Sequence, residues 1–247
     1  MKIIGIIPAR FASTRFSGKP LVDIGGKPMI VRVYEQAKKA ARLAAVYIAT
    51  DDERIAEVAR KHNCEFVMTS AEHPSGTDRC AEAVRKIEGS WDAVINIQGD
   101  EPFIQPEQID LLASLFTDAT VEIGTLVKKL KDPSDLDNPN TMKVVLDNSG
   151  NGMYFSRSAI PFVRNFPKAE WTGHHLFFRH IGIYGYRTQV LEKITKLPVG
   201  RLEKAESLEQ LRWLENGYRI RTALTDMETI SIDAPQDIDK LRRAGLI

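Results

Sequence analysis

The chain opens with the stretch IIGIIPARFASTRFSGKP, residues 3–20, and the rest of the fold is organised around it. An isoleucine-rich run ends at Pro8, a pattern typical of a buried strand in a parallel sheet. Three cations follow, Arg10, Arg15 and Lys19, with three hydroxyl residues between them. A loop after such a strand lies at the carboxyl edge of the sheet, where open α/β sheets bind ligands.

The composition of this loop suits a polyphosphate ligand. Arg grips phosphate oxygens through two parallel hydrogen bonds, and Lys acts as a point charge. A solvated basic loop is the alternative, but the position directly after a buried strand favours phosphate binding. Lys19 and Lys27 are each followed by Pro instead of the Ser or Thr of a P-loop, and no G-x-G-x-x-G follows the strand. If this loop binds phosphates, side-chain cations therefore provide much of the binding.

Composition narrows the class of protein. The 247 residues are enough for one large α/β domain or a domain with a lobe, and 43% hydrophobic with 27% charged residues is ordinary for a soluble globular chain. A formal net charge of +1 argues against broad nucleic-acid binding. Cys64 and Cys80 are expected to be buried thiols in a reducing cytosol. With no signal-peptide pattern and no membrane-spanning stretch, we expect a cytoplasmic protein without a membrane partner.

Strands and helices alternate through the first half of the chain. Strands are expected at 46–50, 65–68 and 91–97. Helices are expected at 28–42, 54–62, from about Ser75 to about Ile87 with Thr77 as the N-cap, and at 107–116. This alternation predicts a parallel sheet that helices cover on both faces.

The pattern changes after residue 121. Short strands are expected at 121–130, 142–146, 153–155 and 181–186, with a loop or lobe at 162–178. Helices are expected at 187–196, 202–216 and 236–244, and a strand at 219–224. We expect a single domain over residues 1–247, with an inserted lobe at about 128–190. This antiparallel-looking insert could carry substrate specificity, a dimer interface or both.

Two aspartates are candidate metal ligands. Asp100 follows an apolar strand and a Gln-Gly turn, where the ligand crevice of an α/β sheet is expected. Near phosphates, a carboxylate there would hold magnesium, which is usually bound by one or two carboxylates and substrate phosphates. Asp233 ends the strand-like residues 230–232. The alternatives are a turn or cap for Asp100 and an N-cap of the last helix for Asp233.

Residues in the second half of the chain could bind a polar ligand. Arg suits a planar carboxylate, and His and Tyr suit sugar hydroxyls. The residues concerned are Arg157, Arg164, His180 and Tyr184. Taken alone, each is better explained as a surface or satisfied residue. Glu209 and Gln210, inside a predicted helix, are then explained as part of its solvated face.

Nine short motifs nevertheless occur in one order along the whole chain. They are IPAR (7–10), STR (13–15), GKPL (18–21), ATD (49–51), SGTDR (75–79), QGDEP (98–102), YFSR (154–157), RHIGIYGY (179–186) and LEQLR (208–212). Together they resemble 3-deoxy-manno-octulosonate cytidylyltransferases, also called CMP-Kdo synthetases. The family's Asp-Thr-Pro-Glu-Asp motif appears here as residues 233–237, with its first Asp kept.

The resemblance implies an α/β fold, a three-layer α/β/α nucleotidyltransferase (Rossmann-like) sandwich with a smaller antiparallel lobe that forms a homodimer. It also implies a reaction in which CTP and Kdo, an acidic eight-carbon sugar, give CMP-Kdo and diphosphate for lipopolysaccharide synthesis, with magnesium as cofactor. The implied nucleotide-binding residues are Pro8, Ala9, Arg10, Arg15, Lys19, Ser75, Arg79 and Gln98. The implied metal ligands are Asp100 and Asp233, and the implied catalytic residues are Arg10, Lys19 and Asp100. The implied Kdo-binding residues are Arg157, Arg164, His180, Tyr184, Glu209 and Gln210.

Two alternatives stay open at this point. The same chemistry could act on 8-amino-Kdo, which differs from Kdo by one substituent. A catalytically inactive nucleotide-binding protein on this fold is the other, although the full set of charged residues argues against it. The sequence indicates no general base for the sugar hydroxyl.

Overall fold

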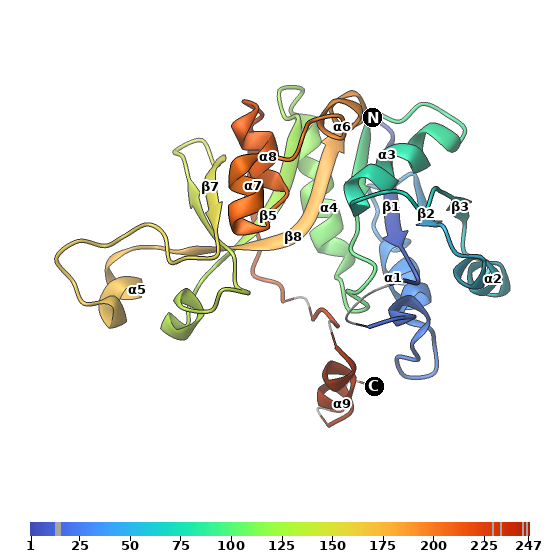
Figure 1. The fold of residues 1–247 in the computed structure, drawn as a ribbon, viewed down its shortest axis with the longest axis horizontal. Coiled ribbons are helices and arrows are strands. Elements are labelled where there is room, and N and C mark those ends of the chain that lie inside the picture. The colour runs from blue at the N-terminus through green and yellow to red at the C-terminus, as the bar shows by residue number, and fades with distance from the viewer. Residues whose placement is uncertain (13–15, 229, 233, 244, 246) are drawn as a thin grey trace. The chain divides into compact units, whose positions relative to one another are not determined.

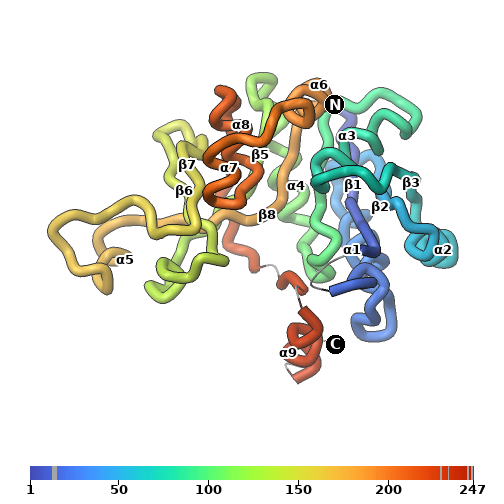
Figure 2. The backbone as a smooth tube through the Cα atoms, viewed as in Figure 1, coloured from blue at the N-terminus to red at the C-terminus, as the bar shows by residue number. Residues whose placement is uncertain are grey.

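The computed structural model describes residues 1–12, 16–228, 230–232, 234–243, 245 and 247. Its chain forms two compact units (Figures 1 and 2). The first unit contains Met1–Ser114 and Glu228–Ile247, and the second contains Leu115–Met227. The expected insert at 128–190 lies inside the second unit, and the division of the chain into one domain with a functional lobe stays a prediction.

The first unit is built on a parallel sheet. Its strands are β1 (Ile3–Ala9), β2 (Ala45–Thr50), β3 (Phe66–Met68) and β4 (Ala93–Asn96), in the order β3-β2-β1-β4. Every pairing among them is parallel, as the alternation predicted. Ile4, Ile6 and Ile7 of β1 are fully buried because the strand is central and covered on both faces.

Helices cover both faces of this sheet (Figure 1). They are α1 (Met29–Ala37), α2 (Glu53–Lys61), α3 (Gly76–Lys86) and α4 (Pro106–Ser114). The last helix, α9 (Pro235–Arg243), instead packs against Ile24 and Met29. The α1 helix packs on β1 and β2 beside α4, whereas α3 packs on β1 and β4. The β1–β2 and β3–β4 crossovers run in opposite directions across the sheet, so right-handed connections place α1 and α3 on opposite faces. This gives the helix–sheet–helix sandwich that the resemblance implied.

Two expected details of these helices are wrong. The first helix ends at Ala37 and not at residue 42, because the N–H groups of Ala41 and Arg42 donate to the carboxylate of Asp110 instead of continuing the helix. The N-cap of α3 is Ser75 and not Thr77. Ser75 has an extended backbone, and its hydroxyl accepts from the N–H of Asp78 at 3.2 Å.

Both cysteines lie in the first unit and are buried as predicted, and the reducing compartment stays a prediction. Cys64 and Cys80 are buried and are not joined in a disulfide, and burial raises the pKa of the Cys64 thiol to about 11. Among the residues that the structure describes, no helix is long and apolar enough to cross a membrane.

The second unit has mixed strand pairing. Its strands are β5 (Ile123–Lys129), β6 (Lys143–Leu146), β7 (Gly152–Ser156), β8 (Phe178–Arg187) and β9 (Ile220–Leu224). The β5 strand pairs antiparallel with β8 and parallel with β9, and β6 pairs antiparallel with β7 and β8. The helices are α5 (Trp171–His174), α6 (Thr188–Ile194), α7 (Arg201–Glu206) and α8 (Gln210–Glu215).

The single helix expected at 202–216 is two helices, α7 and α8. Ser207 between them has left-handed backbone angles of 52° and 49°. Arg157 holds this break, because its guanidinium donates to the carbonyl oxygens of Glu206 at 2.7 Å and Ser207 at 3.3 Å. The carboxylate of Glu206 in turn accepts from the Ser156 hydroxyl at 2.6 Å. A residue 50 positions away in sequence therefore satisfies carbonyls that a continuous helix would have paired internally.

Candidate active site

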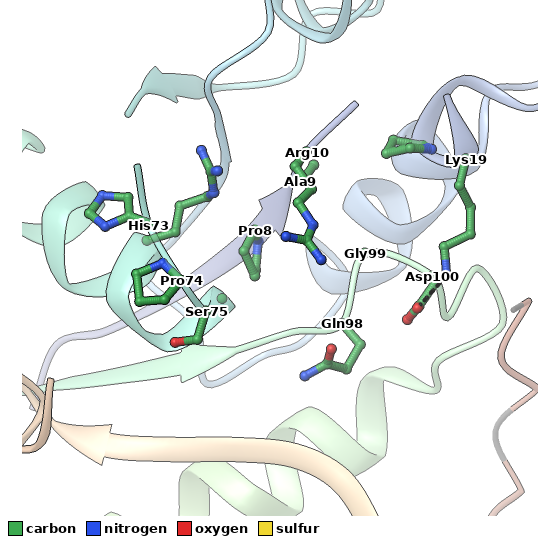
Figure 3. A pocket seen from close by; sticks show the side chains of 13 residues that line it. Pro8, Ala9, Arg10, Lys19, His73, Pro74, Ser75, Gln98, Gly99 and Asp100 are labelled. Carbon is green, nitrogen blue, oxygen red and sulfur yellow. Dashed lines mark hydrogen bonds and ion pairs between the residues drawn. The ribbon is translucent and has the colours of Figure 1, made fainter. Parts of the chain in front are cut away.

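A cavity of about 250 Å³ lies in the first unit, at the carboxyl edge of β1 and β4 (Figure 3). Its walls are the end of β1, the start of α3, the turn after β4 and the short 3₁₀ helix η1 (Lys19–Leu21). All the described residues predicted to bind nucleotide or metal in this unit line it: Pro8, Ala9, Arg10, Lys19, Ser75, Arg79, Gln98 and Asp100. Arg15 lies outside the described residues. Open α/β sheets bind ligands at the carboxyl ends of neighbouring parallel strands, and the cavity lies at that position.

Two glycines let the walls close around Pro8. A Cβ atom at Gly99 would lie 3.0 Å from the carbonyl oxygen of Pro8, and one at Gly76 would lie 3.2 Å from the Pro8 ring. The backbone of Pro8 cannot shift easily, because β1 is paired with β2 at this residue and with β4 up to Ile6. The absence of side chains at these two positions therefore keeps the β4 turn and the α3 N-terminus close to β1.

Lys19 and Asp100 pair with each other in the cavity. The Lys19 Nζ lies 2.7 Å from Asp100 Oδ2, and the two side chains are 16% and 28% exposed. Lys19 also donates to the carbonyl of Ile232 at 3.0 Å, and the N–H of Ile232 donates to the carbonyl of Asp100 at 2.9 Å. The segment that ends at residue 232 is thus tied to the Lys19 side chain and to the backbone of Asp100. Asp233 itself lies outside the described residues.

Arg79 and Arg10 differ in how they are held. Arg79 is buried, and its guanidinium contacts the Asp51 carboxylate at 2.9 Å and the Thr69 hydroxyl at 2.6 Å. It therefore joins the α3 N-terminus to the ends of β2 and β3 while lining the cavity. Arg10 is exposed and its side chain extends beside Pro8 into the cavity (Figure 3). Among the residues that the structure describes, Arg10 has no ion pair.

The outer wall of the cavity includes His73, whose ring contacts the Glu82 carboxylate of α3. Glu82 also accepts from the N–H of Ser70 at 2.8 Å and from Lys86 Nζ at 2.6 Å. Burial opposes ionisation of Glu82, but these hydrogen bonds outweigh it and lower the pKa of the carboxyl to about 2. The loop that carries Pro74 is therefore fastened to α3 through one partly buried charge.

A second cluster lies wholly in the second unit. The residues His180, Tyr184 and Gln210 are 7%, 8% and 4% exposed. Their Nδ1, hydroxyl and Nε2 atoms are buried and have no hydrogen-bond partner among the described residues. Buried polar groups are normally paired, and an unpaired one costs about 1–3 kcal/mol. Three such atoms in one cluster make it a candidate site for a polar ligand.

An irregularity in β8 brings this cluster together. The register between β5 and β8 shifts between Thr125 and Leu126, which pair with Tyr184 and Ile181. Residues four apart on a regular strand are about 13 Å apart, yet the His180 and Tyr184 rings are 5.1 Å apart. Trp213 of α8 packs edge-on against Tyr184 at 5.1 Å, and Gln210 lies one turn before it on the same helix face.

Burial makes both rings neutral at physiological pH. It lowers the pKa of His180 to about 3 and raises that of Tyr184 well above its ordinary value. Phe155 packs edge-on against the His180 ring at 5.2 Å. The cluster thus combines neutral hydrogen-bonding groups with packed aromatic rings. Such a cluster is better suited to bind sugar hydroxyls than to bind a charged group.

The other predicted sugar-binding residues are placed differently. Arg157 uses three of its donors on the carbonyl oxygens of Glu206, Pro139 and Ser207. Arg164 is exposed, and Glu209 is the residue before α8. The interpretation of Glu209 and Gln210 as a solvated helix face is wrong for Gln210, which is buried.

Sequence reasoning missed the residues that hold these sites in place. Glu82, Thr69 and Thr125 carry no motif signal, because their partners come from distant segments. The glycines at 76 and 99 stand in quoted motifs, but only the close approach to Pro8 shows what they do.

Comparisons with known proteins give one consistent result. A family model described as cytidylyltransferase matches residues 4–223. A 3-deoxy-manno-octulosonate cytidylyltransferase of Parabacteroides distasonis is 55% identical over 97% of this chain and 96% of that protein. One of Bacteroides thetaiotaomicron is 55% identical over 96% of each. A solved structure of CMP:2-keto-3-deoxy-manno-octonic acid synthetase, complexed with CTP, is 40% identical with a TM-score of 0.91, covering 100% of this chain and 99% of that one.

Proposed function

The chain belongs to the family of 3-deoxy-manno-octulosonate cytidylyltransferases, and from this premise we propose how its residues share the reaction. The enzyme converts CTP and Kdo into CMP-Kdo and diphosphate. The anomeric hydroxyl of Kdo attacks the α-phosphorus, a new P–O bond forms, and the bond to the leaving diphosphate breaks. Such a transfer depends mainly on positioning and on neutralising phosphate charge.

One observation carries the assignment of roles in the first unit: the Lys19 ammonium and the Asp100 carboxylate meet in the cavity at 2.7 Å. We propose that Lys19 and Arg10 bind the triphosphate, with Arg15 as a third cation of the same loop. Lys19 would then stabilise the charge that grows on the departing diphosphate. Arg79, Ser75 and Gln98 would form the nucleoside end of the cavity.

Asp100 fits a magnesium ligand. Its carboxylate already holds a cation, the Lys19 ammonium, and one or two carboxylates with substrate phosphates are enough for magnesium. Asp233 is the proposed second ligand. When bound, magnesium supplies charge neutralisation at phosphate oxygens and lowers the pKa of a nearby hydroxyl. Asp100 would exchange its Lys19 partner for the metal, which leaves the ammonium for the phosphates.

We assign the sugar to the second unit. His180, Tyr184 and Gln210 would each pair a buried polar atom with a Kdo hydroxyl, with Glu209 beside them. The Kdo carboxylate needs a cation, and Arg164 is exposed and suited to bind a planar carboxylate. Arg157, whose donors reach three carbonyls, would bind sugar only with its remaining N–H groups.

We also propose a homodimer through the segment between β7 and β8, which extends beyond the strands of the second unit (Figure 2). Phe162, Phe166 and Leu176 in it are 76%, 41% and 49% exposed, an apolar surface that a second copy could cover. Sedimentation of the wild-type protein should give a dimer, and Phe162→Glu should shift it toward monomer. A monomeric wild type at micromolar concentration would contradict this assignment. Dependence on CTP and the buried thiols favours the cytoplasm.

The test of function is diphosphate release from CTP and magnesium, with Kdo and 8-amino-Kdo offered separately. We expect release with Kdo preferred, and loss of release when EDTA removes the metal. Preference for the amino sugar would keep the mechanism and change the substrate. Folded protein that releases no diphosphate with either sugar would contradict the proposed roles.

A further inference from the structure

Thr125 is a fully buried polar residue of β5, and its hydroxyl lies at the irregularity of β8. The Thr125 Oγ1 is 2.7 Å from the carbonyl oxygen of Ile183, 3.2 Å from that of Ile181 and 2.9 Å from Nε2 of His180. Two of these partners are carbonyls that the shifted register presents to β5, and the third belongs to the sugar cluster. One hydroxyl therefore joins the strand irregularity to the His180 ring.

The number of protons decides the direction of these hydrogen bonds. A hydroxyl has one proton to donate, and a carbonyl oxygen can only accept. An O···O separation of 2.7 Å requires a proton between the two atoms, so the hydroxyl donates to Ile183. The contact with Nε2 is then a hydrogen bond only if His180 carries a proton on Nε2 and donates it to Thr125.

The other ring nitrogen follows from this assignment. In a neutral imidazole that is protonated on Nε2, the Nδ1 atom carries a lone pair and can only accept. The Nδ1 atom of His180 is buried and has no partner within the described ranges of the chain. Burial also lowers the pKa of His180 to about 3, so the ring is neutral at pH 7.

We infer that Thr125 is a positioning residue of the sugar site, which fixes His180 as the Nε2–H tautomer so that Nδ1 accepts a hydrogen bond from a hydroxyl of the sugar. This inference rests on the proposed role of His180 in Kdo binding. The inference also specifies the direction of the hydrogen bond to the sugar, because the Nδ1 atom of His180 can pair only with a hydrogen-bond donor. A sugar that presented a carbonyl, an ether or a carboxylate oxygen at this point would leave Nδ1 unpaired.

The tautomer can be measured without substrate or turnover. Two-bond nitrogen–proton correlation spectra of protein with ¹⁵N-labelled histidine distinguish the Nε2–H and Nδ1–H forms, and the chain has five histidines. A His180→Gln variant identifies the His180 signal by its absence. We expect the Nε2–H form in the ligand-free wild-type protein. An Nδ1–H form would overturn the inference whatever the enzyme's activity.

Two variants of Thr125 test the positioning role. Thr125→Val keeps the shape and removes the hydroxyl, whereas Thr125→Ser keeps the hydroxyl and removes one methyl group. We expect Thr125→Val to lose the pure Nε2–H signal and to lower kcat/KM for Kdo by roughly 10- to 100-fold, the cost of one mispaired buried group. The KM for CTP should change less than about threefold, because the nucleotide residues lie in the other unit. Thr125→Ser should restore both readouts.

Three results separate the possible failures. Thr125→Val with the wild-type tautomer and a reduced kcat/KM would mean that Thr125 only braces the strand, which overturns the inference. A changed tautomer with unchanged use of Kdo would overturn the link to the substrate. If wild-type protein released no diphosphate with Kdo, the proposed function would fail, while the wild-type spectrum would still decide the tautomer.

Discussion

Replacing Glu82 with Gln would show how much one charge contributes to the wall of the nucleotide cavity. The carboxylate accepts from the Ser70 N–H at 2.8 Å and from Lys86 at 2.6 Å, and it contacts His73. These bonds bring the pKa to about 2, against an ordinary 4.5. Such a difference between folded and unfolded chains corresponds to roughly 3 kcal/mol of stability at neutral pH. The Glu82 side chain is 15% exposed, so solvent screens this interaction only in part.

The pH dependence follows from the direction of the shift. The folded chain holds the Glu82 proton more weakly than the unfolded chain, so the contribution is complete above about pH 4.5 and is lost as the pH falls toward 2. Urea unfolding followed by circular dichroism should show Glu82→Gln less stable by roughly 2–3 kcal/mol at pH 7. The difference from wild type should shrink below about pH 4.5. KM for CTP should rise, because the loosened loop carries His73 and Ser75.

Glu88→Gln is the matched control, since it removes the same charge from an exposed residue just beyond α3. It should change stability by less than about 0.5 kcal/mol. Equal losses in the two variants would refute the reasoning. A Glu82→Gln deficit that stayed constant from neutral pH to about pH 3 would also refute it, because the ionised carboxylate would then contribute nothing specific.

Three further substitutions test the cavity. Asp100→Asn should cut kcat by roughly 100-fold or more while the circular dichroism spectrum stays unchanged, and near-normal turnover would remove Asp100 from metal binding. Lys19→Ala should raise KM for CTP more than KM for Kdo, whereas equal rises would indicate a folding defect. Gly99→Ala places a Cβ 3.0 Å from the Pro8 carbonyl, so it should cost roughly 1–3 kcal/mol in urea unfolding and weaken CTP binding. Unchanged stability and CTP affinity would show that the β4 turn can move freely.

Local pattern determined most of the first unit. Neighbouring residues alone show the isoleucine run before Pro8, the strand-helix alternation and the loop cations. In any parallel sheet, these features lead to a ligand site beyond the carboxyl ends of the strands. A parallel sheet brings the carboxyl ends of its strands to one edge. The meeting of the β1 loop with Asp100 could therefore be predicted without coordinates. The family motifs added the identity of the ligands, which pattern alone did not supply.

Some features depended on partners far apart in the chain. Lys19 and Asp100 were expected to bind phosphate and metal, and their pairing with each other is visible only once β1 and β4 are neighbours. The helix expected at 202–216 breaks at Ser207 because Arg157 satisfies its carbonyls from 50 residues away. Local helix propensity contains no information about a partner so distant in sequence, so the break could not be predicted from it.

The pair His180 and Tyr184 shows the same division within one strand. The sequence by itself determined that residues 181–186 form a strand and that His180 and Tyr184 stand in a family motif. Only the tertiary structure decided that their rings lie 5.1 Å apart and that Thr125 pairs with His180. The register shift between β5 and β8 causes both, and a register is set by the fit of two separate strands. Its position and its effect on side chains are properties of that pairing and not of either strand alone.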